Sequence, residues 1–550
     1  MKISVDWLKE YIKIEDSTEE LAHKLTNTGL EVEGIEKFEE IDGGLEGLVI
    51  GKVVSCKQHP NADKLKITTV DVGNDDIVPV ICGAPNVTEG QKVVMAKVGT
   101  TLYPTGGGNF KIKKAKIRGE ISEGMICAED EIGLGAKHDG ILVLDTELSL
   151  GTPVKDYFEV KSDDILEIGL TPNRADATSH IGVARDIKAI SGNEVMLPDV
   201  SNFKIDNQDL PIEVIVENSQ GCPRYSGITI KNITIKDSPK WLQTRLLSIG
   251  LTPINNVVDV TNFVLHEFGQ PLHAFDADHI KGGKVVVKTL TEGTKFVTLD
   301  EEERSLKADD LMICDDADGM CIAGVFGGIG SGVTSNTENV FLESAYFSPD
   351  YIRRTALAHD LKTDASFRFE RGTDPNITVH ALKRAAMLIK EVAGGTISSE
   401  IIDVYPQKIT DFEVKMKYGN ISRLIGKILD KELIFSILKS LDIRVEGEND
   451  EGFTAWVPPY RVDVQREADV IEEILRIYGY DNVEIPDQLN SDYLADFPEK
   501  DIYKIQEKLT DLLASNGFNE VMTNSLTTPV FSEKIEGFNL REDVEILNKL

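Results

Sequence analysis

Four carboxylates stand close together in the stretch YRVDVQREADVIEEILRIYGYD, residues 460–481. They are Asp463, Asp469, Glu472 and Glu473. The last three are spaced i, i+3 and i+4, so a helix would place them on one face, where like charges repel by about 0.2–0.5 kcal/mol per pair. Two causes could offset this repulsion: the dipole at the start of a helix, or a hard cation such as Mg²⁺, which binds carboxylate oxygens. Spacing alone favours the dipole and leaves the cation open.

A second group of polar residues follows the apolar run in VVDVTNFVLHEFGQPLHAFDAD. The run is predicted to be a strand that leads to Thr261 and Asn262 and then, through a Gly-Gln-Pro turn, to His273. Small polar residues and a histidine at the end of an apolar strand suit the wall of a binding pocket. The alternative is that His273 is a hydrogen-bonded core residue and Asn262 a turn residue.

A lone carboxylate, Glu343, lies between apolar neighbours in VFLESAYFSP. Burying an unpaired carboxylate costs several kcal/mol, so Glu343 is predicted to have a partner. Arg368 or Arg371 of DASFRFERGTDP could be a structural partner, and a ligand hydroxyl could be a functional one. RFERG itself is predicted to be an ion-paired turn.

Two further motifs are rejected. GGIGSG has neither the spacing nor the lysine of a phosphate-binding loop, and CDDADGMC lacks the register of a calcium loop. The six cysteines are scattered without a C-x-x-C pair, which is typical of buried thiols in a reducing cytoplasm. We therefore expect a cytoplasmic protein without zinc or disulfides.

The chain of 550 residues carries a formal net charge of −34, which counts against a nucleic-acid partner because phosphate binding needs a basic surface. The segment FKIKKAKIRGE is a local exception, predicted to be one basic strand with Lys111, Lys113, Lys114, Lys116 and Arg118. No apolar run of about 18 residues occurs, and the charged N-terminus is not a signal peptide.

The length predicts about three to five domains. Residues 1–39 are predicted to be helical, with a capping box at Ser17. Short β-rich runs between turn residues predict a small barrel over 40–151. The remaining predicted units are residues 152–200, which continue the N-terminal segment and include a helix at 182–191; a mixed α/β block, 211–400; a compact unit with the acidic helix, 408–484; and the start of a further domain, 490–550, with a helix followed by a strand.

Taken together, these stretches resemble the β subunit of bacterial phenylalanyl-tRNA synthetase. The residues that carry the resemblance are MKISVDWLKEYI, HPNADKLKITTVDVG, VICGAPNV, LTPNRADATSHIGVARD, VVDVTNFVLHEFGQPLHAFD, FLESAYFSPDYIRRTA, DASFRFERGTDP and RVDVQREADVIEEILRIYGYDNVEIP, in order along the whole chain.

The resemblance implies a multidomain α+β fold. Its parts would be an OB-type barrel that binds tRNA through the basic strand, an editing (B3/B4) module at 211–400, a small helical winged domain (B5, resembling DNA-binding domains) at 408–484, and the beginning of an inactive class II synthetase-like domain from 490. That last domain looks cut short. The resemblance also implies that Asp463, Asp469, Glu472 and Glu473 hold Mg²⁺ near the contact with a catalytic α subunit.

For the site, the resemblance implies hydrolysis of mischarged Tyr-tRNA(Phe). Glu343 would read the tyrosine hydroxyl, and His273, Thr261 and Asn262 would lie around the ester. The backbone of Gly324, Gly327 and Gly328 would approach the substrate closely. Thr252 stands where some relatives have an arginine, which is expected to change how the tRNA end is anchored or to weaken editing.

The expected function is that of the β subunit of an α₂β₂ ligase. This chain would bind tRNA(Phe) and edit, while the α subunit binds ATP and charges the tRNA with phenylalanine. A non-catalytic tRNA-binding scaffold that has lost editing is the alternative. A stand-alone metal-dependent hydrolase is disfavoured, because the acidic residues lie outside the block with the predicted pocket.

Overall fold

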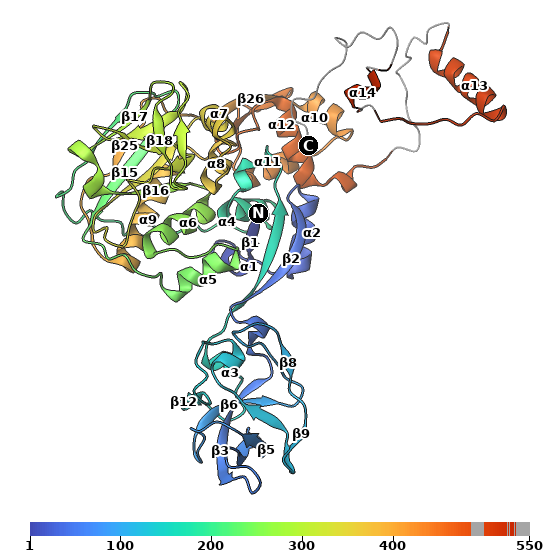
Figure 1. Ribbon diagram of the computed structural model, residues 1–550. Coiled ribbons are helices and arrows are strands. Elements are labelled where there is room, and N and C mark those ends of the chain that lie inside the picture. Colours follow the sequence, from blue (N-terminus) through green and yellow to red (C-terminus); the bar gives the residue numbers. More distant parts are fainter. Residues whose placement is uncertain (486–499, 525, 527, 533, 535–550) are drawn as a thin grey trace. The chain divides into compact units, whose positions relative to one another are not determined.

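The computed structural model describes residues 1–485, 500–524, 526, 528–532 and 534. The chain divides into two compact units, residues 1–483 and 484–550 (Figure 1). Among the described residues, no helix is long and apolar enough to cross a membrane.

The N-terminal module is a three-stranded antiparallel sheet covered by short helices. Strand β13 (Ser162–Gly169) pairs with both β1 (Lys2–Ser4) and β2 (Glu31–Glu39). Its helices are α1 (Val5–Leu8), α2 (Thr18–Asn27) and α4 (His180–Ser191). The capping box at Ser17 is confirmed. The prediction that residues 1–39 are helical is wrong for β1 and β2, because these segments satisfy their backbone groups on the two sides of β13, far away in the sequence.

A β-barrel is inserted between β2 and β13. Its main sheet has the order β11-β6-β3-β4-β5, with β12 beside β6. Glu123 N donates to Pro79 O at 2.8 Å, which brings the segment before β11 against β5 and nearly closes the sheet. The insertion begins and ends at neighbouring points, since Glu39 is opposite Ser162 and Glu40 N donates to Lys161 O at 3.1 Å. The strands are β3 (Leu48–Gln58), β4 (Lys66–Asp71), β5 (Ile77–Cys82), β6 (Lys92–Lys97), β11 (Gly124–Ile126) and β12 (Val143–Leu144), and a short helix α3 (Val154–Tyr157) follows.

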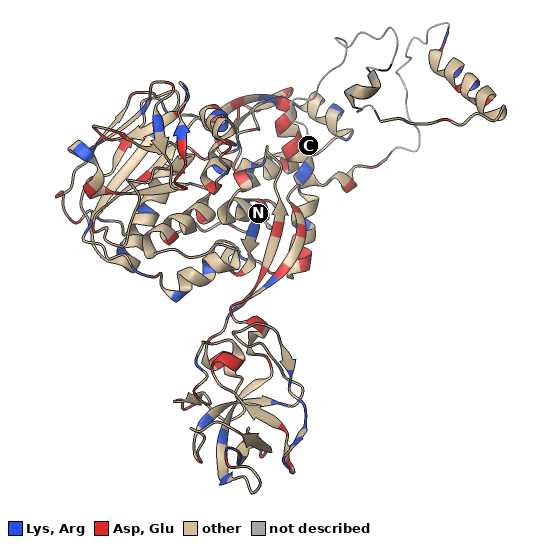
Figure 2. Cartoon of the chain, in the orientation of Figure 1, with Lys and Arg blue, Asp and Glu red and all other residues tan. Residues whose placement is uncertain are grey.

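The predicted basic strand is two short strands in the structure. β8 (Phe110–Lys111) pairs with β7 (Thr101–Leu102), and β9 (Ala115–Ile117) forms a hairpin with β10 (Glu120–Ser122). Basic residues occur along this part of the barrel (Figure 2), and all five predicted residues are exposed. The run therefore presents its charges to solvent.

Residues 212–404 form a module with two five-stranded sheets. One has the order β14-β17-β20-β21-β22 and the other β16-β23-β15-β24, with β25 also on β15. The strands are β14 (Glu213–Val216), β15 (Arg224–Lys231), β16 (Leu272–Asp276), β17 (Lys284–Thr289), β20 (Leu311–Cys314), β21 (Gly319–Ile322), β22 (Phe326–Gly327), β23 (Val340–Tyr346), β24 (Thr396–Ile397) and β25 (Ile402–Val404). A small hairpin, β18 (Lys295–Val297) and β19 (Glu303–Ser305), lies beside the first sheet.

Helices cover the second sheet of this module. α6 (Asn256–Phe268) and α9 (Thr378–Ala393) contact each other and the strands β16, β15 and β23 (Figure 1). Three more helices complete the module, namely α5 (Lys240–Ser248), α7 (Pro349–His359) and α8 (Asp364–Phe369). The prediction that a strand leads to Thr261 and Asn262 is wrong. Asn255 caps this segment as a 13-residue helix that ends at the left-handed Gly269, and every residue of the helix except Val258 and Asn262 is buried.

A small α+β domain completes the first unit. Its sheet has the order β26-β28-β27, with β26 (Phe412–Lys417), β27 (Arg444–Glu446) and β28 (Gly452–Val457). Three helices pack on it: α10 (Tyr418–Ile425), α11 (Lys431–Ser440) and α12 (Glu467–Tyr478). The predicted acidic helix is confirmed as α12.

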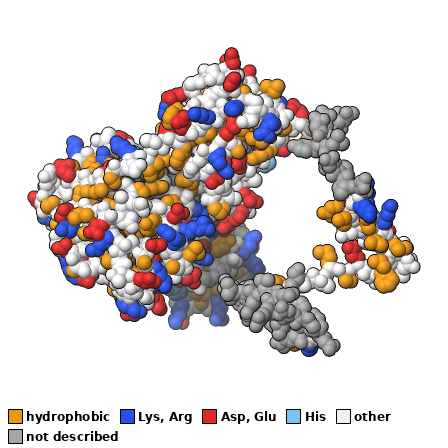
Figure 3. Space-filling model, turned by 90° about the horizontal axis from the view of Figure 1, so that it is seen from above, with side chains coloured by type: hydrophobic (Ala, Val, Ile, Leu, Met, Phe, Trp, Pro, Cys, Tyr) orange, Lys and Arg blue, Asp and Glu red, His pale blue; other side chains and the backbone are white. Residues whose placement is uncertain are grey.

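In the second unit the structure describes α13 (Ile502–Ser515), which confirms the predicted helix, and α14 (Pro529–Ser532). Residues 519–524, predicted to be a strand, have no regular structure. The rest of the predicted class II domain, residues 490–499 and 535–550, lies outside the described residues. Acidic, basic and hydrophobic side chains are interspersed on the face of the molecule seen in Figure 3.

Candidate functional site

The predicted pocket residues meet in a cavity of about 250 Å³, named here the Glu343 cavity. Strand β16 contributes His273, β23 contributes Glu343 and helix α6 contributes Asn262. The opposite wall comes from β21, β22 and the start of α8. The other lining residues are Leu265, Pro271, Leu272, Leu299, Cys321, Gly324, Val325, Phe326, Gly327, Thr363, Asp364, Ala365 and Phe369.

Glu343 is a buried carboxyl group with a tyrosine as its partner. The hydroxyl of Tyr225, on the neighbouring strand β15, donates to Glu343 Oε2 at 2.7 Å. Burial raises the pKa of Glu343 to about 8, although the Tyr225 hydrogen bond opposes this shift. The predicted partners Arg368 and Arg371 are wrong: Arg368 bonds Asp364 and Arg371 bonds Glu370, which confirms the ion-paired turn. Within the described part of the chain, Glu343 Oε1 has no hydrogen-bond partner and can bond a ligand.

His273 lies directly opposite Glu343 in the antiparallel pair β16–β23, so both side chains leave the sheet on the same face. Its Nε2 atom is buried and has no hydrogen-bond partner among the described residues. Burial lowers the pKa of His273 to about 4, so the ring is neutral at pH 7. A neutral imidazole can accept or donate one hydrogen bond at this position. The prediction that His273 is a hydrogen-bonded core residue is therefore not supported by its contacts.

Glycine backbone forms the opposite wall of the Glu343 cavity. Gly324 has φ +66°, and a Cβ there would lie 2.8 Å from Phe347 Cδ2. A Cβ on Gly327 would lie 2.8 Å from Leu299 Cδ1 and 3.3 Å from His273 Cε1. Only glycine at these positions leaves room for the ring of His273 and for the approach of a ligand to the main chain.

Not every predicted residue reaches this cavity. Thr261 points into helix α6, where its hydroxyl donates to Val258 O at 2.7 Å, and it does not line the cavity. Gly328 lines a neighbouring cavity instead. Thr252 is exposed and outside the lining. The sequence analysis missed Tyr225 and Thr363, although the apolar alternation of CPRYSGITI and the Thr-x-x-Ser capping pattern before α8 were both available signals.

The four clustered carboxylates line a separate cavity of about 260 Å³, named here the acidic cavity. Asp463 and Glu472 are exposed and have neither a hydrogen bond nor an ion pair within the described part of the chain. Asp469 and Glu473 are buried and already paired, Asp469 with Arg466 at 2.8 Å and Glu473 with Arg476 at 2.7 Å. Across the described ranges, no three His, Cys, Asp or Glu side chains have the arrangement of a metal site.

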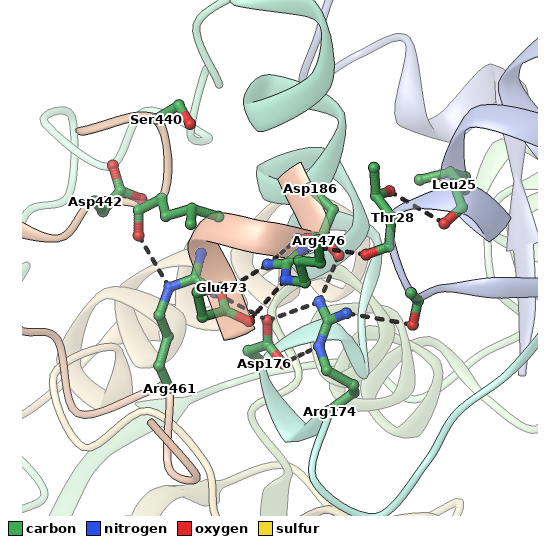
Figure 4. A network of polar contacts seen from close by, with 12 residues as sticks. Leu25, Thr28, Arg174, Asp176, Asp186, Ser440, Asp442, Arg461, Glu473 and Arg476 are labelled. Atoms are coloured by element: carbon green, nitrogen blue, oxygen red, sulfur yellow. Dashed lines mark hydrogen bonds and ion pairs between the residues drawn. The ribbon is translucent and has the colours of Figure 1, made fainter. Parts of the chain in front are cut away.

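Glu473 also belongs to a buried ion network that joins α12 to the N-terminal module (Figure 4). Arg461 bonds Glu473 at 3.0 Å and Leu441 O at 2.9 Å, and it approaches Asp176 at 3.5 Å. Arg476 bonds Asp186 at 3.2 Å and Thr28 O at 3.1 Å. Arg174 pairs with both Asp176 and Asp186. The acidic cavity therefore lies where α12 meets the loop that carries Arg174.

Comparison with protein families assigns three parts of the chain. Residues 48–153 match the tRNA binding domain family, residues 221–394 the B3/4 domain family, and residues 414–480 the tRNA synthetase B5 domain family. Curated relatives match over the whole length. The phenylalanine-tRNA ligase beta subunit of Bacteroides fragilis (strain YCH46) is 55% identical over 100% of this chain and 68% of its own length.

The chain belongs to the phenylalanine-tRNA ligase beta subunit family. Other members share 50% identity (Porphyromonas gingivalis, 100% of this chain and 68% of that protein) and 43% identity (Geobacter metallireducens, 97% and 66%). As a phenylalanine-tRNA ligase beta subunit, the chain is part of an aminoacyl-tRNA synthetase.

In this phenylalanine-tRNA ligase beta subunit, each predicted group of residues falls in one matched domain. The exposed basic run lies in the tRNA binding domain, the Glu343 cavity lies in the B3/4 domain, and the four carboxylates lie in the B5 domain. The acidic cavity and the Glu343 cavity have no lining residue in common.

Proposed function

We propose that this chain works in an α₂β₂ ligase, where the α subunit uses ATP to charge tRNA(Phe) with phenylalanine and this chain removes tyrosine from mischarged Tyr-tRNA(Phe). The observation that carries the editing role is the Glu343 cavity, in which a buried carboxyl group has one free oxygen and faces an unpartnered histidine nitrogen.

The need for editing follows from the similarity of the two amino acids. Tyrosine differs from phenylalanine by one hydroxyl, and an apolar pocket rejects such an analogue only about 10²-fold. A second site that hydrogen-bonds the hydroxyl discriminates far better, because phenylalanine would leave its buried polar group unpaired. Glu343 can serve in this way: neutral at pH 7, its free oxygen can bond the phenol while Tyr225 holds the other oxygen.

Ester hydrolysis in this cavity requires positioning more than acid–base chemistry. An aminoacyl ester is already activated, so an oriented water and donors to the developing oxyanion account for much of the rate. His273 Nε2 and the Asn262 amide can orient the substrate or water, and the backbone at Gly324 and Gly327 is close enough to meet the ester. We assign His273 a positioning role, since its pKa of about 4 makes it a weak base.

The experiment that tests editing measures release of tyrosine from preformed Tyr-tRNA(Phe), with Phe-tRNA(Phe) alongside and with the α subunit in parallel reactions. Hydrolysis of Tyr-tRNA while Phe-tRNA is spared supports the proposal. If neither ester is hydrolysed although the chain binds tRNA, the chain is a scaffold that has lost editing.

Removing the Tyr225 hydroxyl should loosen Glu343 without changing the cavity wall. We expect Tyr225→Phe to lower kcat/KM for Tyr-tRNA about tenfold. Without the Tyr225 hydroxyl, the buried Glu343 carboxyl group either stays unpaired, at a cost of about 1–3 kcal/mol, or turns away from its position in the cavity. Parallel deacylation and thermal unfolding measurements check this. Tyr346→Phe, on the neighbouring strand β23, is the matched control and should change neither quantity. Full activity of Tyr225→Phe would contradict the role of Tyr225.

For Mg²⁺, the donor chemistry of the acidic cavity fits the ion in part. Mg²⁺ keeps several waters and needs only one or two direct carboxylates. Asp463 and Glu472 carry no ion pair among the described residues and would hold it, whereas Asp469 and Glu473 are already bonded by arginines and would accept hydrogen bonds from its waters. A bound ion would supply positive charge that offsets the repulsion among the four carboxylates.

Calorimetric titration with Mg²⁺ tests this assignment. We expect Asp463→Asn combined with Glu472→Gln to weaken Mg²⁺ binding at least tenfold, since the ion loses both direct ligands. Asp481→Asn, an exposed residue outside the cavity, should leave it unchanged. Unaltered Mg²⁺ binding in the double variant would mean that the ion binds at another site.

The basic run in the barrel is proposed to bind the tRNA backbone. We expect Lys113→Glu combined with Lys116→Glu to weaken tRNA(Phe) binding and to reduce the slope of log K against log salt by about one for each phosphate that the variant no longer neutralises. Filter binding at several salt concentrations measures both. Lys137→Glu, exposed in another loop of the barrel, is the control and should affect binding much less.

A further inference from the structure

A larger cavity of about 520 Å³ lies next to the Glu343 cavity in the same module. We name it the lysine cavity after Lys281, Lys288 and Lys295, which line it. Strand β17 contributes Lys288, hairpin β18–β19 contributes Lys295 and Phe296, and the turn after β22 contributes Gly328 to Ser331. None of the roles assigned above uses it.

The two cavities share one thin wall. In β21, Met320 lines the lysine cavity and Cys321 lines the Glu343 cavity; after β22, Gly328 and Gly327 divide in the same way. Consecutive Cα atoms are about 3.8 Å apart, so at this point a single backbone separates the two spaces.

Hydrogen bonds and glycines keep this wall in place. Leu299 N donates to Gly327 O at 3.0 Å, and Gly328 N donates to Met320 O at 2.9 Å. A Cβ on Gly328 would lie 2.6 Å from both Met320 O and Phe296 Cζ, so no side chain can thicken the wall there. The two cavities are therefore adjacent spaces on the two sides of one backbone layer, and a chain molecule whose end occupies the Glu343 cavity would pass the edge of this layer to place its preceding units in the lysine cavity.

Among the three lysines of the lysine cavity, Lys288 is the group that could bind an anion. Lys281 is paired with Asp318 at 2.7 Å and Lys295 with Glu303 at 3.2 Å. Lys288 is half-buried and has neither an ion pair nor a hydrogen bond to any residue that the structure describes. The remaining acidic group, Asp315, accepts hydrogen bonds from three backbone amides.

Two further titratable groups, Cys314 and His279, line the lysine cavity and do not pair with Lys288. Burial raises the pKa of the Cys314 thiol to about 11, so it is neutral at pH 7. His279 is exposed, with its Nδ1 3.9 Å from Asp276. Lysine binds phosphate as a point charge, and the Phe296 ring in the same cavity offers a surface on which a base can stack.

We propose that the lysine cavity binds the phosphodiester backbone of the RNA immediately before the esterified 3′ end, with Lys288 as the main phosphate contact. This inference rests on the proposed editing function, and it specifies which part of the tRNA substrate the lysine cavity binds. The aminoacyl group would occupy the Glu343 cavity while the phosphates of the preceding nucleotides lie across the Gly327–Gly328 wall.

The test compares two substrates in the wild-type chain and in Lys288→Gln. One is Tyr-tRNA(Phe), and the other is 3′-O-tyrosyl adenosine, which has no phosphate. We expect Lys288→Gln to raise KM for Tyr-tRNA about tenfold and to leave kcat unchanged, because the variant loses the hydrogen bond between the lysine and a charged phosphate. Hydrolysis of tyrosyl adenosine should be the same in both proteins.

Lys284→Gln is the matched control, because Lys284 is also half-buried and lies four residues earlier on β17, outside the cavity lining. Its KM for Tyr-tRNA should stay at the wild-type value. An equal rise in KM for both variants, an unchanged KM in Lys288→Gln, or an equal loss on tyrosyl adenosine would each overturn the proposal.

Failure of editing itself would be distinguishable. If the wild-type chain hydrolyses neither tyrosine ester, the proposed function fails, and the cavity is tested by fluorescence anisotropy with a short uncharged RNA that has the terminal sequence of tRNA. Weaker binding by Lys288→Gln but not by Lys284→Gln would then support the lysine cavity as an RNA site. Equal binding by all three proteins would overturn it.

Discussion

Replacing Glu343 with alanine is expected to abolish the preference of the chain for Tyr-tRNA over Phe-tRNA. The variant loses the carboxyl group that lies opposite His273 in the cavity, and with it the hydrogen bond that phenylalanine cannot make. Sites that bond a substrate hydroxyl discriminate by about 10⁴–10⁵-fold, so we expect kcat/KM for Tyr-tRNA to fall by at least about 10²-fold. Deacylation of both esters, measured side by side, checks this.

Glu343→Gln is the conservative control. Glutamine keeps the shape of the neutral carboxyl group and can both donate and accept, so we expect discrimination at pH 7 to stay within about tenfold of wild type. If Glu343→Ala still spares Phe-tRNA and clears Tyr-tRNA at the wild-type rate, Glu343 does not read the hydroxyl.

The difference in stability between the wild-type chain and Glu343→Gln is expected to depend on pH. The pKa of Glu343 is raised to about 8 in the folded chain, so between about pH 4.5 and pH 8 the folded state holds a proton that the unfolded state has released. Stability from this group is therefore lost as pH rises through that window, by roughly 5 kcal/mol in total. We expect Glu343→Gln to gain thermal stability over wild type progressively from pH 5 to pH 8.

Replacing Arg476 with methionine should release α12 from the N-terminal module. Arg476 bonds Glu473 and Asp186, both almost completely buried, and also Thr28 O. Removing one partner of a buried ion pair costs about 3–5 kcal/mol, because a charge remains without compensation. Amide hydrogen exchange in α12 should accelerate by a corresponding factor of at least about 10².

Arg466→Ala provides the comparison within the same helix region. Arg466 pairs with Asp469, but its side chain is 79% exposed, so its removal should cost less than about 1 kcal/mol. Adding Glu473→Gln to Arg476→Met should recover part of the loss, since the uncompensated charge is removed. Equal exchange rates in Arg476→Met and Arg466→Ala would mean that the network does not hold α12.

The sequence predicted correctly those elements that are determined by residues close together in the chain. The capping box at Ser17 satisfies backbone groups of α2 within a few positions, and the acidic helix α12 has Glu467 and Asp469 in its first turn. Prediction failed where partners are distant. β1 and β2 are strands only because β13 lies between them, and α6 is a helix buried on nearly every side whose apolar run was interpreted as a strand.

The site shows the same division. Resemblance and residue type brought His273, Asn262 and Glu343 together correctly around one cavity. The partner of Glu343 could not be read from its neighbours, because Tyr225 is 118 positions away and reaches it through the pairing of β15 with β23. Thr261 was misplaced because it was expected to follow a strand, whereas it lies inside helix α6, where its hydroxyl donates to Val258 O.

The barrel is spliced into the N-terminal sheet at a point where Glu39 and Ser162 are cross-strand neighbours. Its two connections therefore form the stem of a hairpin, and the barrel takes the place of the turn. A cassette of this kind can be lengthened, exchanged or deleted while β2 and β13 keep their register, since only a short turn is needed to close the stem. The RNA-contacting part of the chain could thus have been acquired or replaced without redesigning the module that supports it.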